Sequence, residues 1–335
     1  MNMTLSVRAR AVCGQLRWIV FAGAVVLSLV VTPILQAQEM NGFNLSGAAI
    51  PRDRIHHGGP AKDGIPAIDR PIFVTAKQGG TFLKDDDGVL GVAHRGVVRA
   101  YPIRILNWHE IVNDRFADQP VLITFCPLCG TGMVFESRAD DRTLDFGVSG
   151  LLYNSDVLMY DRQTQSLWSQ IMMRAVSGPM NGKRLTPIAV THTTWADWRK
   201  SHPATQVLSA ETGHVRSYDR NPYAGYETSE SVLFPVEFRA AGYHPKERVL
   251  GIVLGGQYKA YPFVELGKGP GMVSDRVGGV AVTVRFDRGA PRATAHAADG
   301  AQLPAVVGFW FAWYAFHPQT GIYRFNEPNP GATKR

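Results

Sequence analysis

The sequence predicts a β-dominated α+β fold, made of two diverged copies of one strand–strand–helix–strand module with a middle segment inserted between them. Short apolar runs alternate with frequent glycines and prolines, of which the chain has 34 and 21. Long helical patterns are rare, and this combination is typical of β-rich folds. Several short stretches also return in the same order further along the chain, which indicates an internal repeat.

Residues 1–37 have the pattern of a secretory signal peptide. Three arginines precede a short apolar run at 18–31, and Ala37 offers a small residue at a cleavage point. The run is short for a membrane span, which needs about 20 apolar residues. We therefore expect an exported protein, periplasmic or secreted. An uncleaved signal would instead anchor the chain to the inner membrane, and we expect no other membrane contact.

The remainder of the chain divides into five segments. They are an irregular N-terminal lead-in at 38–86, a first module at 87–168, a middle segment at 169–246, a second, degenerate module at 247–325, and a tail at 326–335. Residues 260–262 repeat the Ala-Tyr-Pro of residues 100–102, and residues 316–320 echo residues 160–164. The repeat predicts that both modules begin with a pair of short strands followed by a helix.

In the first module the helix is predicted from Pro102 to about Asn113. Proline suits the first turn of a helix, and the apolar residues that follow recur every three or four positions. On such a helix His109 and Asn113 would share one face, with Glu110 in the next row. A buried strand is expected at 121–125.

The run CPLCG, which contains Cys126 and Cys129, lies between two apolar stretches and is the clearest candidate for chemistry. Gly130 can take the left-handed backbone conformation that a tight turn requires. A strand, this turn and a second strand together have the shape of a metal-binding knuckle. In the second module Asp287 stands where the first has Cys126, so we expect only the first module to be reactive.

Two cysteines alone make an incomplete metal site, because a closed zinc site has four protein ligands. His109, on the preceding helix, and Met133, four residues beyond Cys129, are the candidate further ligands. Thiolates with histidine or methionine favour a soft metal ion, so copper is preferred over zinc. Glu110 and Asp161 are candidates for contacts that orient a ligand.

Two other functions are left open. A Cys-x-x-Cys pair whose thiol pKa is lowered can exchange disulfides, which would make the protein a periplasmic thiol–disulfide oxidoreductase. Thioredoxin-like motifs open a helix, however, whereas this one is followed by a strand pattern. The third possibility is a ligand- or polysaccharide-binding module with structural cysteines. Its aromatic loop at 218–226, which includes Tyr223 and Tyr226, would then hold the ligand.

The composition does not predict a nucleic-acid partner. The formal net charge is +7, but three of the arginines belong to the predicted signal peptide. No basic run with interleaved aromatic residues occurs. The sequence also has no glycine-rich phosphate loop and no Gly-x-Ser-x-Gly motif, so it predicts neither a partner nor a reaction.

Several long stretches resemble a bacterial family known as domain of unknown function 3179. They are AYPIRILNWHEIVND, TFCPLCGTGMVF, FGVSGLLYNSDVLMYDRQTQSLWSQ, SGPMNGKRL and WADWRKSHPATQVLS. The resemblance covers about residues 87–325. It implies exported or envelope-associated proteins without an agreed activity, and it supplies no catalytic residues. Cys126, Cys129 and His109 fall inside these stretches.

Overall fold

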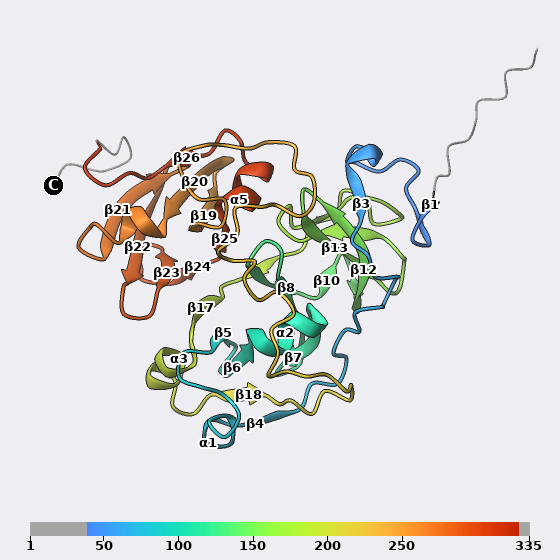
Figure 1. Cartoon of the computed structure of the whole chain (residues 1–335), viewed down its shortest axis with the longest axis horizontal. Coiled ribbons are helices and arrows are strands. Elements are labelled where there is room, and N and C mark those ends of the chain that lie inside the picture. The colour runs from blue at the N-terminus through green and yellow to red at the C-terminus, as the bar shows by residue number, and fades with distance from the viewer. Residues whose placement is uncertain (1–38, 328–335) are drawn as a thin grey trace, which may run out of the picture. The chain divides into compact units, whose positions relative to one another are not determined.

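The computed structural model describes residues 39–327, which form 26 strands, five α-helices and one 3-10 helix (Figure 1). The predicted β-dominated fold with few helices is confirmed. The predicted signal peptide, 1–37, lies outside the described residues. Within the described part of the chain no helix is long and apolar enough to cross a membrane.

An eight-stranded sheet carries the cysteines. Its strand order is β26-β20-β19-β25-β9-β8-β7, and β16 pairs with β9 beside this path. The strands are β7 (Ile111–Phe116), β8 (Gln119–Cys126), β9 (Thr131–Glu136), β16 (Pro187–Ile188), β19 (Arg248–Leu254), β20 (Gln257–Pro262), β25 (Val306–Phe309) and β26 (Gly321–Ile322). The sheet therefore joins strands of both predicted modules.

Two five-stranded sheets and one four-stranded sheet complete the main structure. The first is β17 (Thr191–Thr194), β5 (Gly88–His94), β6 (Val97–Pro102), β18 (Gln206–Leu208) and β4 (Phe73–Thr75). The second is β15 (Arg174–Ala175), β14 (Leu167–Ser169), β13 (Asp156–Asp161), β12 (Phe146–Tyr153) and β3 (Ile55–His57). The third is β21 (Met272–Val277), β22 (Val280–Asp287), β23 (Arg292–His296) and β24 (Gln302–Leu303).

The remaining elements are short. The predicted irregular lead-in contains two-residue strands and brief helical turns. These and the other small elements are β1 (Glu39–Met40), β2 (Phe43–Asn44), the 3-10 helix at Arg52–Arg54, α1 (Ala76–Gly79), β10 (Arg138–Ala139), β11 (Arg142–Thr143), α2 (Ile103–His109), α3 (Trp195–Ser201), α4 (Phe263–Leu266) and α5 (Trp310–Phe316).

Two segments, 88–208 and 248–322, show the same pattern of strand pairing. In the first, β5 pairs antiparallel with β6 and β17, and β18 runs parallel to β6. In the second, β19 pairs antiparallel with β20 and β25, and β26 runs parallel to β20. We interpret the two segments as copies of one module, with the cysteine connection and the β12–β13 hairpin inside the longer one.

Equivalent side chains make equivalent contacts in the two segments. A Cβ atom built on Gly91 would lie 2.2 Å from the ring of Trp198, and one on Gly251 would lie 2.1 Å from the ring of Trp313. Each glycine therefore lets a helix tryptophan lie flat on the first strand of its segment. This close approach fixes the distance between the helix and the sheet.

The predicted match between residues 316–320 and 160–164 is wrong. Residues 160–164 lie at the end of β13, whereas 316–320 lie at the end of α5. The equivalent of 316–320 is 201–205, which ends α3. In both places the helix tryptophan donates a hydrogen bond of 3.0 Å to a threonine beyond the helix, Trp198 to Thr205 and Trp313 to Thr320.

Helix α2 ends one turn earlier than the sequence predicts. Glu110 has a φ of 58° and terminates the helix, and Ile111 already belongs to β7. His109 and Asn113 therefore do not share a helical face. Asn113 instead donates a hydrogen bond of 2.8 Å to the carbonyl of Phe146, which ties β7 to the sheet that contains β12.

The described residues, 39–327, belong to one compact unit, with a core that has several apolar clusters. The cluster around the cysteines contains both sulfur atoms and aromatic side chains from β14, α5 and the preceding strand β25. The cysteine connection is thus buried between the eight-stranded sheet, α5 and the β12–β15 sheet.

Candidate metal centre

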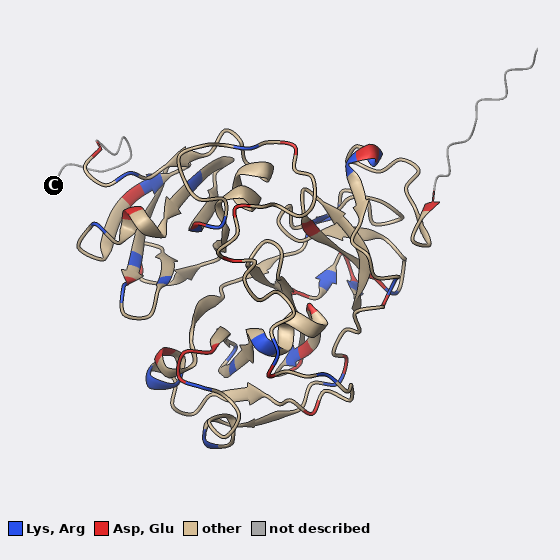
Figure 2. Cartoon of the chain, in the orientation of Figure 1, with Lys and Arg blue, Asp and Glu red and all other residues tan. Residues whose placement is uncertain are grey.

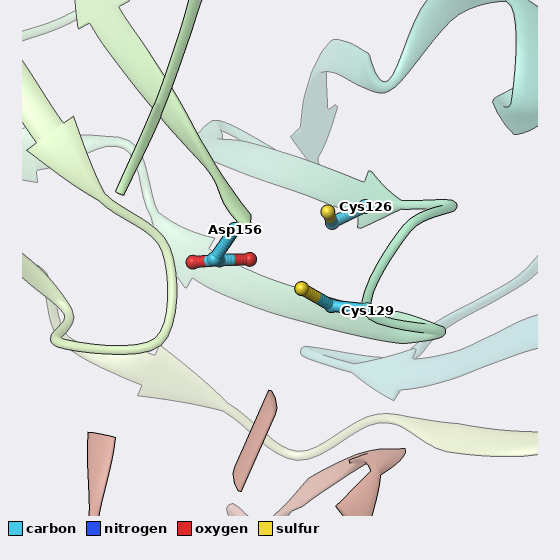
Figure 3. A group of neighbouring side chains, drawn as sticks. All are labelled: Cys126, Cys129 and Asp156. Atoms are coloured by element: carbon cyan, nitrogen blue, oxygen red, sulfur yellow. The ribbon is translucent and has the colours of Figure 1, made fainter. Parts of the chain in front are cut away.

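Cys126 and Cys129 lie in the connection between β8 and β9. Cys126 is the last residue of β8 and pairs with Thr131, the first residue of β9. The backbone N–H of Cys129 donates to the carbonyl of Cys126 at 3.2 Å, and Gly130 has a φ of 60°. The strand–turn–strand arrangement predicted from the sequence is therefore present in the structure, and it directs both sulfur atoms to one side (Figure 3).

Gly130 is needed here for two reasons. Its positive φ disfavours residues with a side chain. A Cβ atom at this position would also lie 2.8 Å from the ring of Phe309 on β25. The N–H of Phe309 donates to the carbonyl of Cys129 at 2.8 Å, so the turn is held against the second segment by its backbone as well.

The third member of the centre is Asp156. One carboxylate oxygen of Asp156 and the two cysteine sulfurs lie within 4.8 Å of one another, and all three residues are buried. Figure 3 shows the carboxylate facing the two sulfurs. The cysteines are not joined by a disulfide. The group Cys126–Cys129–Asp156 could therefore hold a metal ion.

Asp156 reaches this position because it follows a tight hairpin turn. The β12–β13 hairpin closes on Asn154 and Ser155, whose φ values are 51° and 65°. A two-residue turn with both φ values positive matches the twist of the strands and suits asparagine. Serine in this conformation is strained, at a cost of about 1 kcal/mol. The hairpin delivers the Ser155 carbonyl to the sulfurs, where it accepts a hydrogen bond of 3.2 Å from the Cys129 thiol.

The hairpin tip is fastened on both sides. The side-chain amide of Asn154 donates to the carbonyl of Ala315 in α5 at 3.2 Å. Its carbonyl oxygen accepts the backbone N–H of Glu237 at 2.8 Å. Strain that is held in place by surrounding contacts at a site of reactive groups is a common feature of functional sites.

Burial strongly perturbs the two acids of the centre. It raises the pKa of Asp156 to about 7, although the backbone N–H of Ile171 donates to Oδ2 at 3.2 Å. The other oxygen, Oδ1, is buried and has no hydrogen-bond partner among residues 39–327. Burial also raises the pKa of Glu110 to about 8, and the charge of Asp156 adds to that increase.

Burial in this environment favours the protonated form of both cysteine thiols. Burial raises the pKa of both, and the charges of Asp156 and, for Cys126, of Glu110 raise it further. Both side chains are at most 1 % exposed. Disulfide exchange requires an accessible thiolate with a lowered pKa. The two cysteines of this centre have raised pKa values and are buried.

Two tyrosines of the aromatic loop at 218–226, Tyr223 and Tyr226, pack in or against the apolar cluster that contains both cysteines. Burial raises the pKa of both Tyr223 and Tyr226, and the charges of neighbouring groups add to this: Glu110 and Cys126 act on Tyr223, and both cysteines act on Tyr226. The ammonium group of Lys246 lies 4.0 Å from the centre of the Tyr226 ring. The two tyrosines named as possible ligand contacts thus lie near the cysteine centre.

His109 is placed differently from the prediction. Its Nδ1 donates to the carbonyl of Pro66 at 2.7 Å, and its Nε2 accepts from the hydroxyl of Tyr218 at 2.7 Å. Burial lowers the pKa of His109 to about 4, so the ring is neutral. With both nitrogens engaged, His109 does not belong to the group of ligand atoms that includes the sulfurs. It fastens the lead-in and the aromatic loop to α2.

Of the other two candidates, Met133 is buried on β9, on the same face of the sheet as Cys126 and in the same apolar cluster. Asp161 lies at the far end of β13. It accepts the backbone N–H of Thr164 at 2.6 Å and the indole N–H of Trp168 at 2.8 Å, which are the contacts of a turn.

Asp156 is the residue that the sequence prediction missed. A local signal for it exists, because Asn-Ser between two apolar runs is a plausible hairpin turn and the aspartate follows directly. The sequence does not show that this hairpin packs against the cysteine turn.

A family model described as "Protein of unknown function (DUF3179)" matches residues 62–303. Comparisons with curated proteins and with solved structures return no match.

Proposed function

The chain belongs to the DUF3179 family, whose description names no activity, and from its own geometry we propose that it binds a metal ion between Cys126, Cys129 and Asp156. The observation that carries the proposal is the convergence of two sulfurs and one carboxylate oxygen within 4.8 Å in a buried site. Oδ1 of Asp156, which lacks a partner among the described residues, supports it.

The donor set favours zinc. Copper is the expectation when His109 and Met133 complete the site, because both suit a soft ion. Asp156 brings an oxygen instead, and zinc accepts thiolate sulfur and carboxylate oxygen together in tetrahedral sites. A bound divalent cation would also favour the ionised forms of all three ligands.

Glu110 lies outside the group of atoms within 4.8 Å, but as a buried acid close to it we consider it the candidate for a fourth ligand. Glu110 is buried, and its charge raises the pKa of Cys126. The charge of Asp156 in turn raises the pKa of Glu110. Its backbone is fixed next to β8, because its carbonyl accepts the N–H of Phe125 at 2.7 Å. A site with three protein ligands and one open position would be the arrangement of a catalytic zinc ion. Whether Glu110→Gln retains the metal decides between these arrangements.

Disulfide exchange is the weaker alternative. Asp156 could accept a thiol proton, since its pKa is about 7. A protein disulfide, however, would have to reach two sulfurs that are at most 1 % exposed and packed in a cluster with Tyr226. Exchange requires an exposed thiolate, so the burial of both cysteines argues against it.

The test is metal content after equilibrium dialysis of the reduced full chain against limiting zinc or copper(I), followed by elemental analysis. We expect about one zinc ion per chain, and loss of that ion in Cys126→Ser and Asp156→Asn. Asp86→Asn, an exposed acid elsewhere, is the matched control. His109→Gln should retain the ion. A parent protein that binds no stoichiometric metal, or a Cys126→Ser variant that binds as much, contradicts the proposal.

A further inference from the structure

A second pocket lies between the four-stranded sheet and α3, away from the cysteine centre. Its volume is about 690 Å³, within the range of small-molecule sites. Residues of β22 and β23 line it on one side. The end of α3 lines it on the other, where the rings of Trp198 and His202 stack with their centres 3.9 Å apart.

The two strands present opposite chemistry on their two faces. One face contributes Val282, Val284, Ala293 and Ala295 to an apolar cluster. The residues between them face the pocket. There Arg285 of β22 lies opposite Thr294 of β23, and Asp287 lies opposite Arg292. Because side chains alternate along a strand, this polar face is a regular feature of the sheet.

Three arginines line the pocket: Arg285, Arg288 and Arg292. Asp287 is the acid among the lining residues. Arg292 is already paired, at 2.6 Å with Asp197 of α3 and at 3.6 Å with Asp287. Figure 2 shows the basic positions along β22, β23 and their connection.

The other two arginines keep donors that could bind a ligand. Within residues 39–327, Arg285 makes no ion pair and no side-chain hydrogen bond. Arg288 donates to the carbonyl of Gly269 and has no carboxylate partner in that part of the chain. His202 adds a buried ring nitrogen, Nδ1, that lacks a hydrogen-bond partner among the same residues. The pocket thus offers unpaired positive charge beside a polar wall.

The pocket occupies the position in the second segment that the cysteine centre occupies in the first. The β8–β9 hairpin ends on the pair Cys126 and Thr131, and the β22–β23 hairpin ends on the pair Asp287 and Arg292. Each pair encloses a connection of the same length. The connection between β8 and β9 contacts β25 of the second segment. The β22–β23 hairpin contacts β17 of the first segment, which is the equivalent of β25, and it also contacts α3.

We propose that this pocket binds a small polyanion, a molecule with at least two phosphate or carboxylate groups, through Arg285 and Arg288. A planar guanidinium group binds such oxyanions with two parallel hydrogen bonds. Two arginines with free donors, one on a strand and one on the adjoining connection, suit two anionic groups of one molecule.

Isothermal titration calorimetry of the full chain with pyrophosphate and with citrate tests this site. Both probes chelate divalent ions, so the protein is first freed of metal and the titration is repeated in Cys126→Ser. We expect saturable binding of at least one probe in both proteins. Pyrophosphate alone would identify phosphate groups as the ligand, and citrate alone would identify carboxylates.

Arg285→Gln and Arg288→Gln should each weaken binding by about tenfold or more, as expected for the loss of charge-assisted hydrogen bonds. Arg239→Gln removes the same charge from an exposed arginine outside the pocket, and it should leave affinity unchanged. All three side chains are exposed, and equal thermal transitions will show that the fold is intact. The site is excluded if neither probe binds, or if Arg239→Gln weakens binding as much as the pocket variants do.

Discussion

Replacing Asp156 by asparagine should stabilise the metal-free protein at alkaline pH while it abolishes metal binding. Asp156 is fully buried, and its pKa is raised from 3.8 to about 7. A carboxyl whose pKa is raised by folding keeps its proton longer in the folded state than in the unfolded state. Stability therefore decreases as the pH rises from about 4 to about 7, because the unfolded chain ionises first.

The size of the effect follows from the shift. A change of about three pKa units corresponds to about 4 kcal/mol, at about 1.4 kcal/mol for each unit. Asparagine has no proton to lose and can keep the hydrogen bond from Ile171. We therefore expect Asp156→Asn to be more stable than the parent by up to about 4 kcal/mol at pH 8. Near pH 4 the two should be similar.

The measurement is urea unfolding in the presence of a chelator at pH 5, 6, 7 and 8. The difference between parent and variant should grow with pH through this window, while Asp86→Asn should follow the parent at every pH. A variant that is no more stable than the parent at pH 8 would refute the reasoning. So would a difference that does not change with pH.

Three further outcomes are expected. Gly91→Ala should destabilise the fold by about 1–3 kcal/mol in urea unfolding, because the new methyl group would overlap the ring of Trp198; unchanged stability would show that the helix moves freely. Cys126 and Cys129 should react with a thiol reagent only after unfolding, since both are buried; fast labelling of the native protein would revive disulfide exchange. His109→Gln should lower stability by about 1–3 kcal/mol through lost buried hydrogen bonds, with unchanged zinc content by elemental analysis.

The sequence predicts the parts of this structure that are determined by residues close together in the chain. The strand, turn and strand around Cys126 and Cys129 can be inferred because Gly130 suits the turn and both flanks are rich in β-branched and aromatic residues. This is a local pattern, and the structure contains it.

The sequence predictions are wrong where contacts between residues distant in the sequence determine the local structure. Helix α2 ends at Glu110 because this residue adopts a positive φ and the next residue joins β7, whose partner β8 is fixed by the sheet. Propensity alone does not predict that end, since glutamate is a good helix former. His109 itself stays in the helix, but its ring nitrogens bond Pro66 and Tyr218, which are distant in the sequence.

The misaligned repeat has a different cause. The segments at 201–205 and 316–320 share the pattern His-Pro-x-Thr, which the sequence alone displays. The first segment, however, carries the additional strands from β10 to β15 between its two halves, whereas β16 pairs with β9 as β24 pairs with β23. A constant offset between the copies therefore fails after β9. Allowing an insertion at a surface connection, where chains tolerate it, recovers the correct match.

A bound cation would offset the cost of burying the acids of this centre in ionised form. Keeping Asp156 ionised and buried without a cation costs about 4 kcal/mol, and Glu110 and two thiols share the same space. A ligand present at 1,000 times its dissociation constant stabilises the folded state by about 4.1 kcal/mol. A zinc ion bound with that saturation would offset the penalty of the aspartate. If a divalent ion binds as we propose, it would stabilise the arrangement in which the strained hairpin, the two tyrosines and the reduced cysteines meet.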